Sequence, residues 1–326
     1  MQISILDQSP VPPGQTSKQA LDDTIELARM ADELGCTRFW ITEHHDLDGI
    51  AGSVPEVLLP LIGSRTNTIR IGTGAVLLPH YKPFKAAEIH NMLATLFPER
   101  VDIGIGRAPG GSAEAANALS DNFLQNAGKM RELTRELLQF LEDNYPSPNP
   151  HAPLSASPVP DKAPVPWMLG TSAKSALLAA EQGTAYAFAA FMSDKKPAEI
   201  IQQYRDHFTS GKLVEKPNVI TAVSVVCAPE SKEAERIADK TCRWNVKKDS
   251  TAPLTKEEER QFEAMKAKMI IGSPREVKIQ LEDCQQQFGA DEIMLFSSIP
   301  SPEERKQSFR LIAEIMMEDK RKKGRT

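Results

Sequence analysis

Apolar residues along this chain fall into two alternating patterns. Short continuous runs, rich in branched and aromatic residues, are typical of buried strands. Eight such runs occur, at residues 3–6, 38–41, 69–75, 101–105, 167–169, 185–188, 219–227 and 291–296. The stretches between them carry apolar residues at helical spacing, with capping residues such as Ser17 and Ser273 at helix starts. We predict helices over residues 17–34, 55–66, 83–97, 113–143, 172–182, 196–209, 232–246, 274–288 and 302–318.

The alternation of strand and helix predicts a parallel sheet of the α/β class. Eight repeats of this unit predict a sheet that closes into a (β/α)8 TIM barrel. A doubly wound open sheet is the alternative, but it more often carries a glycine fingerprint after its first strand. Here that position holds Asp7-Gln8-Ser9-Pro10, so we favour the barrel.

Two segments interrupt the rhythm. Residues 146–166 hold eight prolines in 21 residues, which excludes helix and favours extended backbone. A domain linker is one interpretation, but the rhythm resumes unchanged afterwards, so we predict a surface excursion. Residues 247–268 are polar and charged, and we interpret them as an insertion or mobile loop. We therefore predict one barrel domain over residues 1–326.

Composition and charge narrow the classes of function. The net charge of −5 argues against nucleic-acid binding, which usually requires a basic stripe. The four cysteines are widely spaced and fit a reducing compartment better than a disulfide framework. The N-terminus lacks the features of a signal peptide, and no apolar run has the length of a membrane span. We expect a cytoplasmic protein without a nucleic-acid or membrane partner.

Four consecutive ionisable residues, Glu43-His44-His45-Asp46, follow the second predicted strand. In such a barrel the carboxyl ends of the strands carry the active site. An imidazole there suits a general base, or a metal ion together with carboxylates, and a purely structural role is the plainer alternative. Adjacent side chains on a strand point to opposite faces, so one ion would need a further ligand such as His80 or His90. We favour a general base or a charge-stabilising donor and predict no metal site.

Two other strand ends favour an anion. Gly170-Thr171-Ser172 opens the helix after the fifth strand, and a helix N-terminus offers free backbone N–H groups to a phosphate. Arg107 follows the fourth strand, where a guanidinium can clamp a phosphate. Each signal alone has a plainer explanation, as a helix cap or a salt bridge at the rim. On neighbouring strands, they together predict one phosphate site.

At this order and spacing, the chain resembles the bacterial luciferase-like flavin monooxygenase family over essentially its whole length. It looks most like the uncharacterised single-component members. The segments that carry the resemblance are Phe39-Trp40-Ile41-Thr42-Glu43-His44-His45, Gly72-Thr73-Gly74-Ala75-Val76-Leu77-Leu78-Pro79, Phe97-Pro98-Glu99-Arg100, Gly104-Ile105-Gly106-Arg107-Ala108-Pro109-Gly110 and Leu169-Gly170-Thr171-Ser172.

The resemblance implies that FMN binds at the carboxyl ends of the strands. His44 matches the catalytic histidine of the family, and Gly74-Ala75 matches a non-proline cis peptide beneath the flavin ring. Luciferase proper has an acidic residue in place of Thr171 and a cysteine in place of Gly106, which argues against carrying over aldehyde specificity and light emission. The residues implied to bind the cofactor are Gly74, Ala75, Gly106, Arg107, Gly170, Thr171, Ser172 and Ser175.

The same resemblance implies a monooxygenase that uses reduced FMN and O2 to oxidise a small organic substrate. No second nucleotide-binding unit follows from the sequence, so a separate flavin reductase is the expected source of reduced flavin. The apolar faces of residues 54–62 and 86–96 suggest packing against a partner, and the family commonly forms dimers through this region, so we expect a homodimer. The alternatives are a flavin-binding protein without turnover and a deazaflavin-dependent oxidoreductase that transfers hydride.

Overall fold

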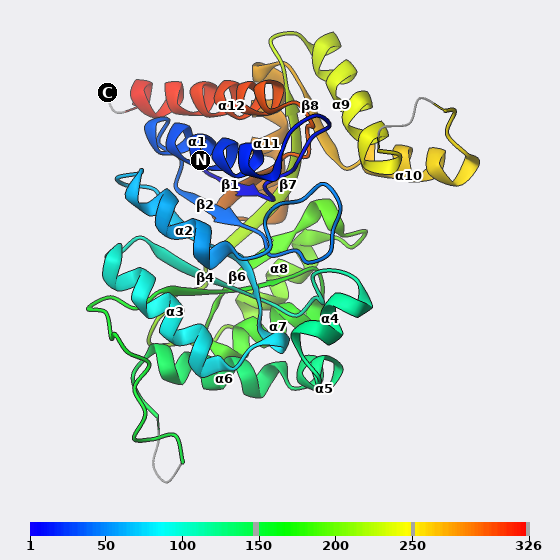
Figure 1. Ribbon diagram of the computed structural model, residues 1–326. Coiled ribbons are helices and arrows are strands. Elements are labelled where there is room, and N and C mark those ends of the chain that lie inside the picture. Colours follow the sequence, from blue (N-terminus) through cyan, green and yellow to red (C-terminus); the bar gives the residue numbers. More distant parts are fainter. Residues whose placement is uncertain (146–149, 249–251, 324–326) are drawn as a thin grey trace.

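The computed structural model describes residues 1–145, 150–248 and 252–323 of the chain (Figure 1). Within these residues, eight parallel strands pair in the order β1-β2-β3-β4-β5-β6-β7-β9, and β9 pairs with β1 to close a barrel. The predicted (β/α)8 TIM barrel is therefore confirmed. The barrel strands are β1 (Gln2–Asp7), β2 (Arg38–Ile41), β3 (Arg70–Leu77), β4 (Val101–Gly106), β5 (Val165–Gly170), β6 (Ala185–Ala189), β7 (Val219–Cys227) and β9 (Glu292–Phe296).

Helices connect the strands and cover the outside of the barrel (Figure 1). None of the helices in the described ranges is both long and apolar enough to span a membrane. The helices are α1 (Ser17–Glu33), α2 (Pro55–Ser64), α3 (Pro83–Leu96), α4 (Ala113–Leu119), α5 (Phe123–Gly128), α6 (Met130–Leu141), α7 (Ala173–Gln182), α8 (Pro197–Asp206), α9 (Ser231–Val246), α10 (Lys256–Lys266), α11 (Pro274–Phe288) and α12 (Pro302–Lys323), with the 3-10 helices η1 (Leu78–His80) and η2 (Ala190–Met192).

Two predictions about the elements were wrong. The single helix predicted over residues 113–143 is three helices, because Ser120 has extended backbone after α4 and Lys129 leaves helical geometry between α5 and α6. Residues 247–268 were predicted to be an insertion or a mobile loop, and the mobile loop was wrong: residues 252–268 contain α10, and a ninth strand, β8 (Met269–Gly272), follows directly. Residues 249–251 of the predicted loop and 146–149 of the proline-rich segment lie outside the described residues.

The ninth strand lies outside the barrel because β7 extends beyond the residues that pair with its barrel neighbours β6 and β9. The beginning of β7 pairs with β6 through Val219–Ala222, and its middle pairs with β9 through Ile220–Ser224. Its last residues, Ser224–Cys227, pair with β8 instead. This extension carries α9 and α10 beyond the barrel, where they project at the upper right of Figure 1.

Side chains of successive strand residues alternate between the barrel interior and the helical layer. In β1, Ile3 and Ile5 belong to a core cluster with residues of the surrounding helices, whereas Leu6 packs with Trp40 and Trp167 of β2 and β5. The two indoles fill the middle of the barrel in an edge-to-face contact, with ring centroids 5.5 Å apart. The alternation explains why the strands have near-continuous apolar sequences: both of their faces are buried.

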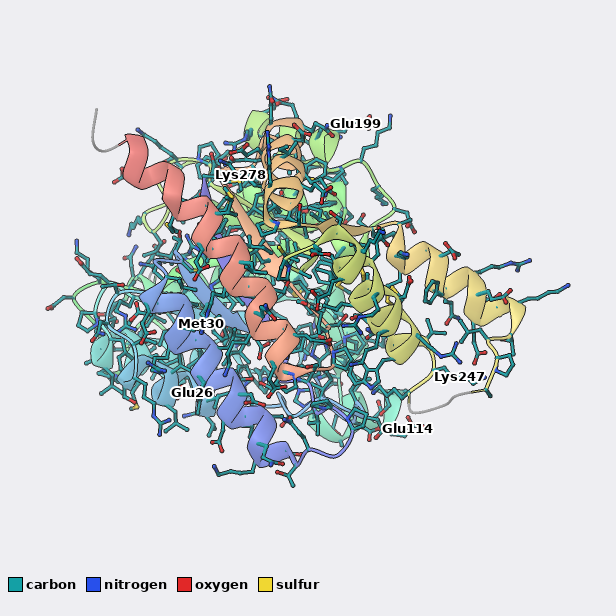
Figure 2. All side chains as sticks on the ribbon, turned by 90° about the horizontal axis from the view of Figure 1, so that it is seen from above. Glu26, Met30, Glu114, Glu199, Lys247 and Lys278 are labelled. Carbon is teal, nitrogen blue, oxygen red and sulfur yellow. The ribbon has the colours of Figure 1, made fainter. Side chains whose placement is uncertain are left out.

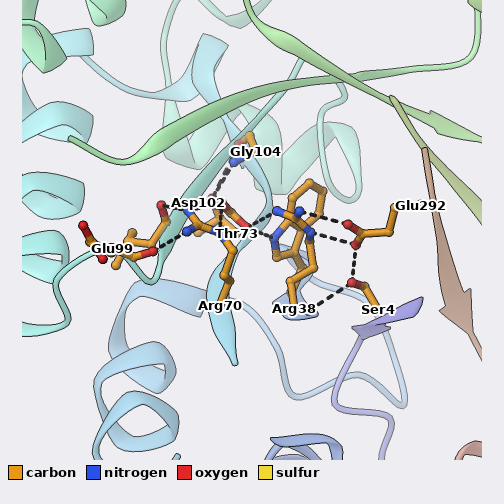
Figure 3. A network of polar contacts seen from close by, with 10 residues as sticks. Ser4, Arg38, Arg70, Thr73, Glu99, Asp102, Gly104 and Glu292 are labelled. Atoms are coloured by element: carbon orange, nitrogen blue, oxygen red, sulfur yellow. Dashed lines mark hydrogen bonds and ion pairs between the residues drawn. The ribbon is translucent and has the colours of Figure 1, made fainter. Parts of the chain in front are cut away.

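A buried ionic network occupies the N-terminal end of the barrel (Figure 3). The Arg38 guanidinium donates two hydrogen bonds to Glu292, at 2.8 and 2.9 Å, and one to Asp102 at 2.7 Å. Arg70 donates to the other oxygen of Asp102, and Trp40 Nε1 donates to the oxygen that Arg38 also contacts. Burial alone would raise the pKa of Asp102, but Arg38 and Arg70 hold it below its usual value. Two cations therefore neutralise two carboxylates at this end, opposite to the strand ends that carry the predicted site.

Candidate active site

The predicted site residues come from four adjacent strands and lie on one arc of the barrel mouth. Neighbouring strands pair in the register Ile41 with Thr73, Leu77 with Gly106, and Ile105 with Met168. The carboxyl ends of β2, β3, β4 and β5 therefore follow one another around the rim. The structure brings together the residues after β2, the Gly74-Ala75 bond, Arg107 and the start of α7.

Glu43 is the polar centre of this arc. Its side chain is buried, and its Oε1 accepts hydrogen bonds from the Tyr81 hydroxyl at 2.5 Å and from His45 Nε2 at 2.8 Å. Its Oε2 accepts from the backbone N–H of Leu77 at 3.0 Å. Burial and the hydrogen bond to Glu43 raise the pKa of Tyr81, so this hydroxyl keeps its proton and donates it. Glu43 thus ties the end of β2 to the end of β3.

His44 is half-buried at the same strand end. Its Nδ1 lies 2.9 Å from the Thr42 hydroxyl, and its backbone N–H donates to Gly52 O at 3.0 Å. Its Nε2 has no hydrogen-bond partner within the part of the chain that the structure describes. Burial, and then the neighbouring His45, lower the pKa of His44 below its usual 6.5. The imidazole is therefore neutral at neutral pH, with one nitrogen available to a ligand.

The peptide bond between Gly74 and Ala75 in β3 is cis, as the resemblance implies. The pairing of β3 with β4 shifts register between Thr73 and Val76, so Gly74 and Ala75 are left outside the ladder. Thr73 precedes this cis peptide and is held in place by its hydroxyl, which accepts from Gly104 N–H at 3.2 Å and lies 3.3 Å from His90 Nε2. Burial lowers the pKa of His90 to about 4, so this ring is neutral and structural.

Arg107 begins the loop that follows β4. Its side chain is exposed, and its guanidinium forms no hydrogen bond or ion pair with the described residues. The loop itself is fixed to the residues after β2, since the His45 N–H donates to Gly110 O at 2.8 Å. A Cβ at position 111 would lie 1.9 Å from His45 O, so only glycine permits this approach. Arg107 is thus a free cation on a positioned loop.

The turn between β5 and α7 is held by its own serines. Ser172 caps the helix, and the Ser175 hydroxyl donates to Ser172 O at 2.7 Å and accepts from Ser172 N–H at 3.3 Å. The Ser175 hydroxyl also lies 3.1 Å from Tyr186 Oη, and burial raises the pKa of Tyr186 to about 12. A Cβ at Gly170 would lie 2.1 Å from Ser175 Oγ, so glycine is required there as well. Ser175 therefore supports the turn from within.

Thr171 differs from the two serines, because its hydroxyl has no partner among the described residues. Backbone N–H groups in the first turn of a helix lack intrahelical partners and carry the positive end of the helix dipole. The N–H groups of Ser172 and Ser175 are bonded within the cap, so Thr171, the N–H groups of Ala173 and Lys174, and Arg107 after the neighbouring strand are the donors that the described residues offer to an anion at this rim. The site can neutralise a phosphate without a metal ion.

Sequence reasoning did not find the roles of Tyr81 and His80. Tyr81 contacts Glu43 across 38 positions of sequence, and no local periodicity reports such a contact. His80 Nε2 donates to Pro109 O at 2.9 Å, and its ring stacks on Phe123 with centroids 4.7 Å apart. Over the described ranges, no group of three or more His, Cys, Asp or Glu side chains is arranged to hold a metal ion.

Comparison with known proteins finds relatives in sequence and in structure. The model of the luciferase-like monooxygenase family matches residues 1–292. The N-acetyl-S-alkylcysteine monooxygenase of Bacillus subtilis is 32% identical, over 98% of this chain and 100% of that protein. The crystal structure of apo-MsnO8 is 33% identical and has a TM-score of 0.85, covering 97% of this chain and 98% of its own.

A more distant likeness extends to a flavin-bound structure. The oxygenating constituent of 3,6-diketocamphane monooxygenase from Pseudomonas putida, solved in complex with FMN, is 21% identical. Its TM-score is 0.72, and the match covers 96% of each chain. At this identity the likeness shows a shared fold.

Proposed function

The chain belongs to the luciferase-like monooxygenase family, and from this premise we propose that it uses reduced FMN and O2 to oxidise a small organic substrate. A separate reductase supplies the reduced flavin. The observation that carries the proposal is the convergence, on one arc of the barrel mouth, of His44, the cis peptide Gly74-Ala75, Arg107 and the first turn of α7. This set contains both hydrogen-bond donors for a phosphate and a surface against which a planar ring could lie.

The residues present fit FMN. Arg107, Thr171 and the first-turn N–H groups of α7 would bind the phosphate, with Ser172 and Ser175 holding that turn in shape. Gly74, Ala75 and Gly106 would lie against the ring, where a Cβ on Gly106 would come within 3.0 Å of the Ala75 Cβ. When bound, reduced FMN supplies the electrons that activate O2. The protein would position the flavin, supply positive charge to its phosphate and exclude water from the site.

His44 is the residue we assign to proton handling. Its available Nε2 and lowered pKa suit a group that accepts a proton near neutral pH. The Thr42 hydroxyl at Nδ1 and the backbone hydrogen bond to Gly52 O hold His44 in place, and the adjacent Glu43 ties the end of β2 to the end of β3. Phe191, directly after β6, stacks on Phe296 at the end of β9 with ring centroids 4.5 Å apart, so apolar rings lie on the side of the mouth opposite to this polar arc.

Replacing Arg107 by Ala tests the phosphate anchor. We expect the affinity for reduced FMN to fall by about 1.5–3 kcal/mol, roughly ten- to 150-fold, because one charge-assisted contact is lost. The measurement is an anaerobic titration of protein into reduced FMN. Arg131→Ala, which removes an exposed arginine paired with Glu181 on the outer helices, is the matched control and should bind normally. Unchanged affinity in Arg107→Ala would remove Arg107 from the site.

The substrate and the cofactor are open to direct assay. The 32% identical relative is named for oxidation of N-acetyl-S-alkylcysteine, so thioethers come first in a screen of oxygen-dependent product formation. Aldehydes and alkanes form the other arms of that screen. A parallel titration with a reduced deazaflavin separates the two cofactor types: tighter binding of the deazaflavin than of FMN would overturn the monooxygenase assignment.

We further propose that the protein is a homodimer formed through α2 and α3. Large apolar side chains on or directly before these two adjacent helices are about half exposed, and burying their exposed area would favour association. They are Val54, Val57, Leu61, Met92 and Leu96, with exposed fractions between 48% and 69%.

Val57→Glu is expected to convert the dimer to a monomer, because a carboxylate would be buried at the interface without a partner. Sedimentation velocity measures the change. Leu124→Glu is the control, since Leu124 is also exposed but lies on α5, away from α2 and α3. Equal sedimentation of Val57→Glu and wild type would place any interface elsewhere.

We also propose one domain over residues 1–326 and a cytoplasmic location. The location is in keeping with four cysteines that form no disulfide in the described structure.

A further inference from the structure

A groove lies on the arc of the barrel mouth opposite to the predicted flavin site. Its walls come from the loop after β1, the loop after β9 and the last two turns of α9. The barrel order places β1, β9 and β7 next to one another, whereas the predicted flavin site uses β2 to β5. The groove has a volume of about 670 Å³, within the range of sites for small organic molecules. None of its lining residues belongs to the site described above.

One wall of the groove is basic. Lys240 and Arg243 lie three positions apart on one face of α9, and Lys247 follows directly after the last residue of that helix. Figure 2 shows Lys247 at the end of the molecule where α9 and α10 project. Among the described residues that line the groove, Glu303 is the only carboxylate, so their side chains carry more positive than negative charge.

Two of these cations are available to a ligand. Arg243 donates one hydrogen bond to Ala252 O and has no carboxylate partner in the described ranges. Lys240 is about half exposed and pairs with Glu304 at 3.4 Å, and an ion pair at such an exposed position contributes little, so a ligand anion can compete for it. Lys247 is less exposed, and its ammonium donates to Glu258 and to Pro253 O, both at 3.2 Å.

The other surfaces of the groove are flat and apolar. Trp244 lines it from α9, and Pro12 and Pro300 line it from the two loops. Lys248 lies over the Trp244 ring, 5.6 Å from its centroid, which places the indole beside a further cation. Flat rings of this kind stack on planar ligands.

Gln15 adds an unsatisfied acceptor. Its Nε2 donates to Asp23 at 3.3 Å, whereas its Oε1 is buried and has no hydrogen-bond partner among the described residues. Gln15 is one of the residues that line the groove.

We propose that this groove is a binding site for a small planar organic anion, an aromatic ring that carries a carboxylate or a phosphate. The ring lies against Trp244 and the proline rings, and the anionic group is bound by Arg243, with Lys240 and Lys247 beside it. The flavin is not this ligand, because the site proposed for FMN lies on the other arc of the mouth. The proposal stands independently of the proposed oxidation.

The test uses the full chain without flavin and reads the fluorescence of Trp244. The other two tryptophans, Trp40 and Trp167, are at most 1% exposed inside the barrel, so a groove ligand should quench Trp244 selectively. The probes are benzoate and phenyl phosphate, with benzyl alcohol as the neutral ring and inorganic phosphate as the anion without a ring. We expect saturable quenching by at least one aromatic anion and binding at least about tenfold weaker for both single-feature probes.

Variants then locate the bound probe. Arg243→Met should weaken binding of the aromatic anion about tenfold or more, measured by calorimetry, and Trp244→Phe should remove the fluorescence change. Arg107→Ala should bind the probe normally, since Arg107 lies on the flavin arc. The proposal is overturned if no aromatic anion binds saturably, if benzyl alcohol or phosphate binds as well as the aromatic anion, or if Arg107→Ala rather than Arg243→Met abolishes binding.

Discussion

Replacing Arg38 by Met is expected to lower the free energy of unfolding by about 3–5 kcal/mol. Arg38 is 5% exposed, and its guanidinium is shared between Asp102 and Glu292, which are 0% and 1% exposed. Methionine keeps much of the side-chain volume but removes the charge and three hydrogen bonds. Two carboxylates would then be buried with only Arg70 to compensate them. Urea denaturation followed by circular dichroism measures the loss.

Arg131→Met is the control for Arg38→Met, since its exposed pair with Glu181 should contribute less than about 1 kcal/mol. Equal stability of the two variants would contradict the view that the buried network stabilises the barrel. Adding Glu292→Gln to Arg38→Met should recover part of the lost stability, because one uncompensated charge is removed. Because the pKa of Asp102 is lowered in the folded protein, its carboxylate contributes fully to the free energy of unfolding above about pH 4. This contribution is lost as the pH falls below that value.

Replacing His44 by Ala is expected to lower substrate oxidation by about 10²–10⁴-fold while leaving the affinity for reduced FMN unchanged. The reason is that the proposed role of His44 lies in proton handling at the mouth, and the phosphate anchor lies two strands away. Steady-state product formation with a flavin reductase measures the first quantity, and anaerobic titration measures the second. His207→Ala removes an exposed histidine from the end of α8 and should retain full turnover.

The pH dependence separates a proton-handling role of His44 from a structural one. Because burial and His45 hold its pKa below 6.5, wild-type turnover should fall only as the pH drops below that value and the imidazole gains its proton. His44→Ala should lack this acidic limb at its residual rate. A variant that keeps the wild-type rate or the same acidic limb would exclude His44 as the titrating group.

Much of the barrel and part of the site were open to prediction from local patterns. Strands such as β2 and β9 are buried on both faces, so their sequences are continuous apolar runs that need no knowledge of a partner. The position of His44 directly after such a run was enough to place it at the mouth. The cis peptide at Gly74-Ala75 followed from the family resemblance, and the structure has it.

The predictions failed where a helix or strand depends on distant contacts. The strand β8 is four residues long, and it forms because the end of β7 extends beyond the barrel and offers an unpaired edge. Nothing in its own sequence indicates that edge. The breaks at Ser120 and Lys129 are likewise invisible to helical periodicity, because apolar spacing continues across them while the backbone turns.

The sequence by itself therefore determined the order of strands and helices, the closed barrel and the strand ends that carry the chemistry. These features follow from the sequence because burial on both faces and helical spacing appear as patterns among residues that are close in sequence. Only the tertiary structure decided which polar groups meet. Glu43 reaches Leu77 and Tyr81, and Arg38 reaches Glu292 across 254 positions, because barrel closure places strands side by side without regard to their separation in sequence.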